Sequence, residues 1–370
     1  MHFFAGARMN QPHTTQPLTS VERVRTVLAG GIPDRVPVDL HNFLMTAQAS
    51  GMPFPAFLRD GEAMADWQIR LWREFGHDLL ILESGTTTLA EACGCDVEYL
   101  PTSAPVLVHP VLTSLDDLDR LSVPDFSNTY PLNQNLKATN IVSKETGQQA
   151  YILGRADQGP FSLASMLLGL ENFLLALSDP DQHDKLHALL AFSLETVYRY
   201  ALAQVESGAH MVSIGESLSG PDVTSPRMYR EFEWGYACKL VERLKQKNIP
   251  LAYHICGNAT RIVGDMAATG AAVLELDYKC DLLKIKEAAR GKTTILGVID
   301  PSGVLARGTP ELVTAKVREE LAVLADGGSL ILGPGCALPP NTPYENIHTL
   351  VEAAHRYGRY SPDGKLLDVD

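Results

Sequence analysis

Eight short apolar runs, separated by helical patterns, limit the fold of this chain more than any other feature of its sequence. Nearly continuous apolar strands that alternate with helices are typical of a parallel sheet covered by helices on its outer face. Eight such units predict an α/β fold of the (β/α)8 TIM-barrel type. The runs are VPVDL (36–40), DLLILE (78–83), AYILGR (150–155), MVSIGE (211–216), LAYHIC (251–256), AVLELD (272–277), TTILGVID (293–300) and SLILGPGC (329–336).

The length of 370 residues suits a single barrel domain. We predict a flexible N-terminal tail over 1–19 and the barrel over 20–370, with Met1 and Met9 as equally good start residues. The helix that follows the tail, TSVERVRTVLAG, has Thr19 or Ser20 as its N-cap. Residues 97–149 contain many turn residues and no strong helical pattern, so we predict an insertion there, after the second strand and near the barrel mouth.

Polar or metal-binding side chains stand at the points where the predicted strands end. In a barrel the carboxyl ends of the strands surround one mouth, and the active site is built there. We therefore expect these residues to form the rim of a candidate active site. They are Asp39, Glu83, Arg155, Glu216, His254, Cys256, Glu275, Asp277, Asp300 and Cys336.

Three of these residues have the side chains of a metal site. His254 and Cys256 are two residues apart on a predicted strand, so both side chains point to the same side of it. Cys336 ends another apolar run and would complete a Cys₂His set, the pattern of a catalytic zinc that keeps its fourth position open. The alternative is a buried thiol beside a hydrogen-bonded imidazole, because free cysteines are usually buried.

Charge and cysteine content narrow the partners and the compartment. Lys and Arg number 31 against 44 Asp and Glu, a net charge of −13, which disfavours nucleic acid or an anionic membrane as partner. The six cysteines lack disulfide-dense spacing, and no secretory signal precedes them, so we expect a reduced, cytoplasmic protein. The most apolar stretch is interrupted by Glu171 and Asn172, so we predict no transmembrane helix.

The wording of several segments resembles the uroporphyrinogen decarboxylase superfamily over nearly the whole chain. The similar segments include RVPVDL, GPFSLASMLLGLENFL, SGAHMVSIGE, GVIDPSGVLARGTPELV and PPNTPYENIHTLVEAAHRYG. The decarboxylase itself carries an arginine-rich stretch after its first strand and Gly-His-Gly near its last. This chain has residues 39–44 (DLHNFL) and 333–335 (GPG) there, so the donors for a substrate with many carboxylates are missing.

The His254-x-Cys256 pair and Cys336 are instead similar to the zinc-dependent corrinoid methyltransferase branch, typified by methylcobamide:coenzyme M methyltransferase. The resemblance implies that Zn²⁺ is held by these three residues. It also implies that a methyl group moves between a thiol and a corrinoid, cobalamin itself or one bound to a corrinoid protein. A homodimer is compatible with this reading.

The remaining assignments concern the carboxylates near the zinc site and the alternative functions. We predict Glu275 as the fourth zinc ligand at rest, with Glu216 and Asp277 as rivals, and we expect Glu216 or Asp277 to accept the other imidazole N–H of His254. Zinc would equally suit the reverse reaction, in which an O- or S-methyl donor methylates the corrinoid. A non-catalytic alternative is a zinc-stabilised binding protein, in which Cys280 closes a Cys₃His site.

Overall fold

A computed structural model describes residues 17–367 of the chain. The predicted flexible tail lies outside the described residues except for 17–19, and so does the choice between Met1 and Met9. The first described helix, α1 (Ser20–Leu28), begins with the expected cap. The Thr19 side chain accepts from the backbone N–H of Glu22, and the Glu22 carboxylate accepts from the N–H of Thr19 in return.

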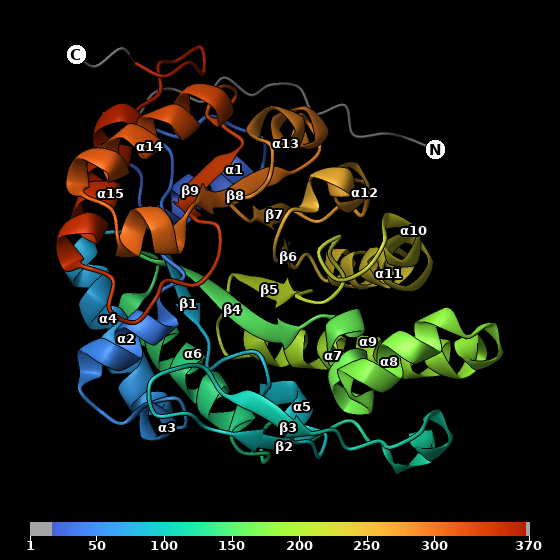
Figure 1. Ribbon diagram of the computed structural model, residues 1–370. Helices are drawn as coiled ribbons and strands as arrows, with labels where there is room; N and C mark the ends of the chain where they lie inside the picture. The colour runs from blue at the N-terminus through green and yellow to red at the C-terminus, as the bar shows by residue number, and fades with distance from the viewer. Residues whose placement is uncertain (1–16, 368–370) are drawn as a thin grey trace.

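Seven strands form one parallel sheet, and they pair in chain order. Figure 1 looks along the axis of this sheet and shows it curled into a ring, with the helices outside it. Each strand comes from one of the predicted apolar runs. The strands are β1 (Leu79–Leu82), β4 (Tyr151–Gln158), β5 (Met211–Gly215), β6 (Leu251–Ile255), β7 (Val273–Leu276), β8 (Thr294–Ile299) and β9 (Leu330–Pro334).

The first apolar run, 36–40, closes the ring between β9 and β1. Val38 forms a parallel bridge with Leu332, and the Asp39 N–H donates to the Leu332 carbonyl at 2.9 Å. On its other side, the Asp78 N–H donates to the Val38 carbonyl at 2.8 Å. This run is therefore the eighth strand position, although its pairing is short. The predicted (β/α)8 TIM-barrel fold is confirmed.

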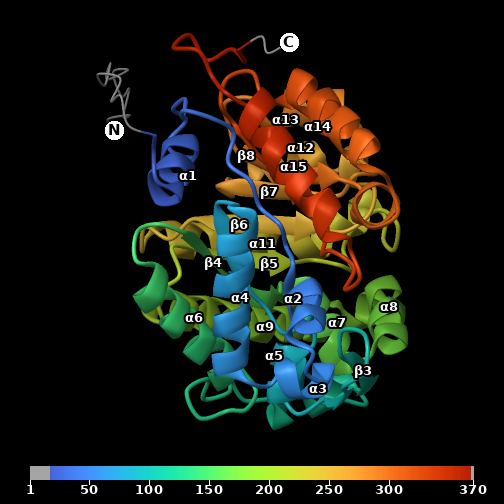
Figure 2. The same ribbon diagram turned by 90° about the vertical axis from the view of Figure 1, so that its left-hand side faces the viewer.

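The helices surround the ring in the order that the sequence pattern predicts (Figures 1 and 2). Among the described residues no single helix is long and apolar enough to cross a membrane, while α7 and α8 together reach that length and composition with a bend of 111°. The helices after α1 are α2 (Phe43–Ser50), α3 (Phe54–Phe57), α4 (Gly61–Phe75), α5 (Thr88–Ala92), α6 (Leu132–Thr146), α7 (Pro160–Leu168), α8 (Leu170–Ser178), α9 (His183–Glu206), α10 (Pro226–Met228), α11 (Trp234–Lys245), α12 (Val263–Ala268), α13 (Leu282–Ala289), α14 (Pro310–Leu324) and α15 (Tyr344–Tyr357).

Helix α1 fills the amino-terminal end of the barrel. Val21, Val24 and Val27 pack in one apolar cluster with inward side chains of β1, β4 and β9, among others. Arg23 is buried and donates to Asp78 at 2.6 Å, which ties the helix to the start of β1. Figure 2 shows α1 at one end of the barrel and α2, α3 and α8 towards the other, so the carboxyl ends of the strands lie at the end opposite α1.

The segment 97–149 differs from the prediction. It contains α6, a 15-residue helix that packs against α4 and the neighbouring strands, so the expectation of no strong helix was wrong. The helical pattern was hidden because polar residues, Asn135, Thr139 and Thr146, occupy buried positions of α6. Before α6 lie the antiparallel hairpin of β2 (Asp96–Glu98) and β3 (Val106–His109) and the 3₁₀ helix η1 (Leu115–Arg120). That an insertion covers the mouth stays a prediction.

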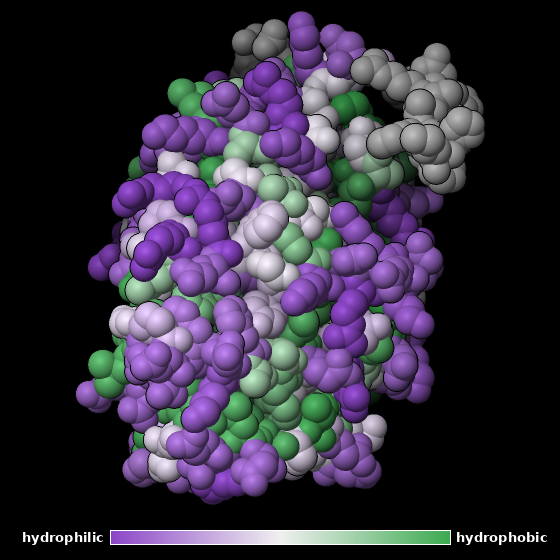
Figure 3. Space-filling model, turned by 90° about the vertical axis from the view of Figure 1, so that its right-hand side faces the viewer, coloured by the Kyte–Doolittle hydropathy of each residue, from purple (hydrophilic) through white to green (hydrophobic). Residues whose placement is uncertain are grey.

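The outer surface is mainly polar. Figure 3 shows hydrophilic side chains over most of the side face of the barrel, with smaller apolar areas between them. Helices with one buried face and one solvated face produce this appearance.

Candidate metal centre

The three predicted metal ligands come from the carboxyl ends of two strands. His254 lies within β6, Cys256 follows that strand directly, and Cys336 follows β9. Gly335 brings the last of these close to β7, since a Cβ at this position would lie 2.6 Å from the backbone nitrogen of Tyr278. Only glycine permits this approach, and Cys336 is thereby placed beside β6 and β7.

The ligand atoms of His254, Cys256 and Cys336 all lie within 4.8 Å of one another. His254 Nε2 and Cys256 Sγ are 3.0 Å apart. The other ring nitrogen, Nδ1, donates to the backbone carbonyl of Glu275 at 3.1 Å, which leaves Nε2 directed at the sulfur. Ligand atoms around a tetrahedral zinc are roughly 3.5 Å apart, so this donor set fits zinc.

The charges in this group favour a cation. A hydrogen bond from Cys336, followed by the charge of His254, outweighs burial and lowers the pKa of the Cys256 thiol to about 3. Burial lowers the pKa of His254, but the charges of Cys256 and Glu275 outweigh it and raise that pKa to about 9. The pKa of Cys336 is raised well above its usual value, first because Cys336 donates to Cys256. Two sulfurs that share protons with an imidazole can lose those protons to solvent when a soft divalent metal binds.

Glu275, the predicted fourth ligand, is next to this group but not within it. Its carboxylate Oε1 accepts from His41 Nδ1 at 2.9 Å and lies 3.8 Å from His254 Nδ1, on the ring edge away from Cys256. Burial opposes the charge of Glu275, but His254 and His41 outweigh burial and hold its pKa well below the usual range. Direct ligation requires the carboxylate to turn from His41, so this role of Glu275 stays a prediction.

His41 is the functional candidate that sequence reasoning missed. Its buried ring bridges two acids, because Nε2 donates to Glu83 at 2.8 Å and Nδ1 donates to Glu275. Burial disfavours the charged ring, but the charges of Glu83 and Glu275 outweigh burial and raise its pKa to about 10. The available signal was its position directly after the first strand. Its positive φ of 39°, which the sequence does not reveal, is part of how it reaches the barrel interior.

The two rival carboxylates have other partners. The Glu216 carboxylate accepts from the backbone N–H groups of Phe161 and Ser162 at the start of α7. Asp277 accepts from Gly257 N at 2.9 Å and from Lys279 N at 3.0 Å. The hydrogen bond predicted from His254 to one of these acids is instead made to a backbone carbonyl. Their catalytic roles stay predictions.

Among the remaining predicted rim residues, Arg155 and Asp39 are buried in the barrel interior, whereas Asp300 caps a short helix. Arg155 is buried, with its Nε 3.8 Å from Glu83 and its Nη1 3.8 Å from Glu275. Asp39 is also buried in the interior. Asp300 is structural, since it accepts from the N–H groups that open the short helix Pro301–Ala306.

Cys280 does not join the metal group in the described part of the chain. Its sulfur lies 3.8 Å from the Gly257 carbonyl, and burial raises its pKa to about 11. A buried, protonated thiol that faces a carbonyl is not a ready ligand. The structure therefore does not assemble the Cys₃His arrangement that the non-catalytic alternative requires.

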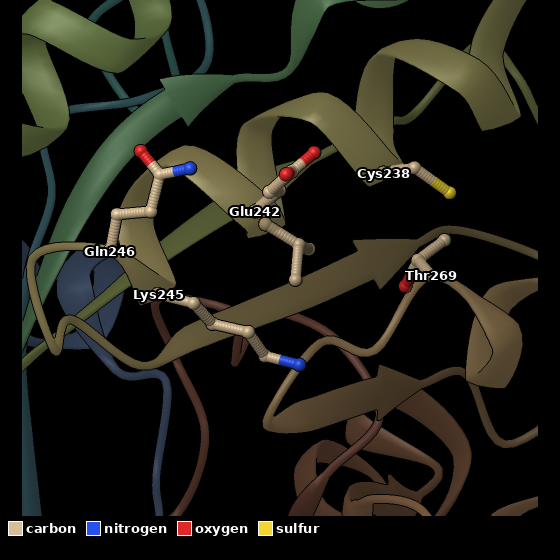
Figure 4. Close-up of a pocket in the computed structure, with 6 residues that line it drawn as sticks. Cys238, Glu242, Lys245, Gln246 and Thr269 are labelled. Atoms are coloured by element: carbon tan, nitrogen blue, oxygen red, sulfur yellow. The ribbon is translucent and has the colours of Figure 1, made fainter. Parts of the chain in front are cut away.

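A cavity of about 470 Å³ lies away from the three ligands, on the outside of the barrel. Figure 4 shows its lining of Cys238, Glu242 and Lys245 from α11 and of Gln246 directly after that helix, with Thr269 opposite them. Burial raises the pKa of Cys238, so its thiol is protonated. The three proposed metal ligands lie at the barrel mouth and do not line this cavity.

The barrel and its rim define a class of protein. The chain belongs to the uroporphyrinogen decarboxylase (URO-D) family, whose pattern matches residues 19–357. Within the family it is similar to the methylcobamide:CoM methyltransferase MtbA of Methanosarcina mazei, with 30% identity over 92% of this chain and 98% of the relative. It is 29% identical to the corresponding MtaA of Methanosarcina barkeri, over 90% of this chain and 97% of the relative.

Other comparisons agree with this placement. A uroporphyrinogen decarboxylase of Coxiella burnetii is 27% identical over 82% of this chain and 84% of its own length. A solved methyltransferase structure from Methanosarcina mazei superposes with a TM-score of 0.83 at 27% identity, over 91% of this chain and 98% of that one. The predicted resemblance to the methyltransferase branch of the superfamily is confirmed.

Proposed function

We propose that this protein is a zinc-dependent methyltransferase that moves a methyl group between a corrinoid and a thiol. The observation that carries the proposal is the His254, Cys256 and Cys336 group at the barrel mouth, which offers three ligands of the Cys₂His type. The names of the relatives, methylcobamide:CoM methyltransferases, support both the enzyme class and the two substrates.

The residues of the chain have distinct parts in this proposal. His254, Cys256 and Cys336 would hold Zn²⁺, which when bound would supply the positive charge that keeps an acceptor sulfur as a thiolate at neutral pH. The Glu275 carbonyl orients the His254 ring, and His41 with Glu83 holds the Glu275 side chain in place. These contacts fix the donor atoms before the substrate arrives, which lowers the cost of positioning it.

The barrel itself restricts access to the reacting atoms. Val21, Val24 and Val27 of α1 fill the amino-terminal end, so a substrate enters from the mouth. The Cys256 and Cys336 side chains are only half-buried there, whereas His254 is buried. A corrinoid brought to the mouth would displace water from the sulfur that it meets.

The partner molecules and the cellular compartment of this reaction are also part of the proposal. The partner is a corrinoid protein or free methylcobalamin, together with a small thiol, and the six cysteines without disulfides are compatible with a reducing cytoplasm. A homodimer stays a prediction.

Metal analysis coupled to a methyl-transfer assay tests the proposal. Purified protein should contain about one zinc per chain and should transfer the methyl group of methylcobalamin to at least one thiol of a panel. A parallel arm offers methoxy and methylthio compounds to Co(I) cobalamin, and activity in that arm alone would indicate the reverse direction. Protein with full zinc and no activity in either arm would contradict the proposed function.

A further inference from the structure

A second cavity, of about 580 Å³, lies at the amino-terminal end of the barrel, away from the metal ligands. One side of it is formed by Ala272, Thr293 and Ser329, which directly precede strands β7, β8 and β9. The end of α1, residues 27–30, forms another side. This volume is within the range of small-molecule sites, and the proposed methyl transfer makes no use of it.

The charged side chains that line this cavity are mainly cations. Lys245, Lys286, Arg290 and Lys292 line it, and Asp326 is the one acid among its described lining residues. The chain as a whole has a net charge of −13, so the sign of the charge is reversed locally. Like charges around one cavity repel each other, and a bound anion would remove that repulsion.

A structural explanation accounts for only one of these cations. Basic side chains are favoured at the carboxyl ends of helices, where carbonyl groups lack partners. Lys286 has this role, because its ammonium group donates to the Val323 carbonyl in the last turn of α14. By contrast, no side-chain hydrogen bond or ion pair joins Lys245, Arg290 or Lys292 to another described residue. These three charges are available to a ligand.

The Lys245 ammonium group lies directly against the wall of the cavity. Lys245 is the last residue of α11, and Figure 4 shows its side chain extended from the end of that helix. A Cβ on Gly270, which lines the same cavity, would lie 2.8 Å from Lys245 Nζ. The absence of a side chain at Gly270 therefore leaves room for the ammonium group at this position.

The rest of the lining includes apolar side chains. Val27 and Leu28 of α1, Ile295 of β8 and Leu324 of α14 belong to the wall. Small-molecule sites combine such an apolar lining with a few polar groups that fix the orientation of the ligand. Lysine and arginine bind phosphate and carboxylate groups through charge-assisted hydrogen bonds. The ligand that fits both parts of the wall has a carbon skeleton and several negative charges.

We propose that this cavity binds a small organic polyanion that carries two or more phosphate or carboxylate groups. The anionic groups contact Lys245, Arg290 and Lys292, and the carbon skeleton packs against the apolar wall. The site lies at the opposite end of the barrel from His254, Cys256 and Cys336. It does not depend on the proposed methyl transfer, so either assignment can fail without the other.

Isothermal titration calorimetry of the full-length, zinc-loaded protein at fixed ionic strength tests the proposal. The probes are fructose 1,6-bisphosphate and citrate, and the comparators with a single anionic group are methyl phosphate and acetate. At least one probe should bind about tenfold more tightly than its comparator, because two further ion pairs contribute about threefold each. The probe that binds identifies the anion as phosphate or carboxylate. If neither probe binds more tightly than its comparator, the proposal is overturned.

A triple variant tests whether these cations form the site. Lys245→Gln, Arg290→Gln and Lys292→Gln together should raise the dissociation constant of the bound probe about thirtyfold, at about threefold for each exposed ion pair. All three side chains are exposed, so the change leaves the core intact. An unchanged dissociation constant in this variant would overturn the assignment of the site.

The matched control removes the same number of charges elsewhere. Lys144, Lys247 and Lys284 are exposed and do not line the cavity. Their replacement by glutamine should change the dissociation constant by less than about twofold, since separate exposed charges are screened by salt. An equal loss in both triple variants would show that binding follows the overall charge and would overturn the proposal. Citrate can also withdraw zinc, but it does so equally in both variants, so their difference reports on the cavity.

Discussion

Replacement of His41 by asparagine should destabilise the barrel strongly, because it removes the cation that is hydrogen-bonded to two buried acids and leaves only Arg155, 3.8 Å from each. Asparagine accepts the positive φ at this position, so the backbone need not change. The ring donates to Glu83 at 2.8 Å and to Glu275 at 2.9 Å. At about 1.5–3 kcal/mol for each charge-assisted bond, the gross loss is about 3–6 kcal/mol. Proton uptake by these two acids offsets part of this, so we expect a net loss of about 3–5 kcal/mol.

The same residue predicts a pH dependence with a definite sign. Glu83 and Glu275 outweigh the effect of burial and raise the pKa of His41 to about 10, whereas an unfolded histidine has a pKa of about 6.5. Its contribution to stability is therefore complete below about pH 6.5 and is lost as the pH rises towards 10. Between pH 7 and 9 this group alone lowers the free energy of unfolding by up to about 1.4 kcal/mol per pH unit, and His41→Asn should lack this slope.

Urea unfolding of metal-free protein, followed by circular dichroism at pH 7 and pH 9, measures both effects. The control is His348→Asn, because His348 is partly exposed and contacts Glu74 at 3.0 Å on the surface. That change should alter stability by no more than about 0.5 kcal/mol. The reasoning is refuted if His41→Asn loses less than about 1 kcal/mol at pH 7 or retains the wild-type slope with pH.

Three further predictions concern the metal centre and the substrate. Cys336→Ala should lose most of the bound zinc in elemental analysis while Cys280→Ala retains it, and equal zinc in the two proteins would contradict the ligand assignment. Zinc X-ray absorption should count two sulfurs in the free protein and three after the acceptor thiol is added, with Glu275→Gln binding zinc almost as well; three sulfurs at rest would favour Cys280 as a ligand. Uroporphyrinogen should release no carbon dioxide above background, since the Asp39–Leu44 stretch lacks the arginines for its carboxylates.

The alternation of apolar runs and helices was sufficient to predict the barrel, because every predicted run became a strand position. The helix α6 was missed because Asn135 and Thr139 are buried through tertiary contacts that no local pattern reports. Thr139 donates to Gln204 of a helix far along the chain, at 3.0 Å. Such a contact makes a polar residue part of the core.

The grouping of His254, Cys256 and Cys336 could be predicted because strand alternation and the ends of parallel strands determine where these side chains lie. The contacts that support these side chains could not be predicted, because they depend on which residues of neighbouring strands lie opposite each other. His254 stands opposite Glu275 in the pairing of β6 with β7, and this brings a backbone carbonyl to the ring nitrogen. A carboxylate was expected there because sequence shows side chains and does not show which carbonyl will be adjacent.

The closure of the barrel by the 36–40 run has a consequence for synthesis of the protein. Val38 is among the first described residues to leave the ribosome, and its partner Leu332 is among the last. Until β9 emerges, the early strand has one open edge, and the nascent chain carries His254 and Cys256 without Cys336. The event that seals the ring therefore also delivers Cys336, the third of the proposed ligands. Tight zinc retention would mark chains that have been translated to the end of the barrel and have closed it.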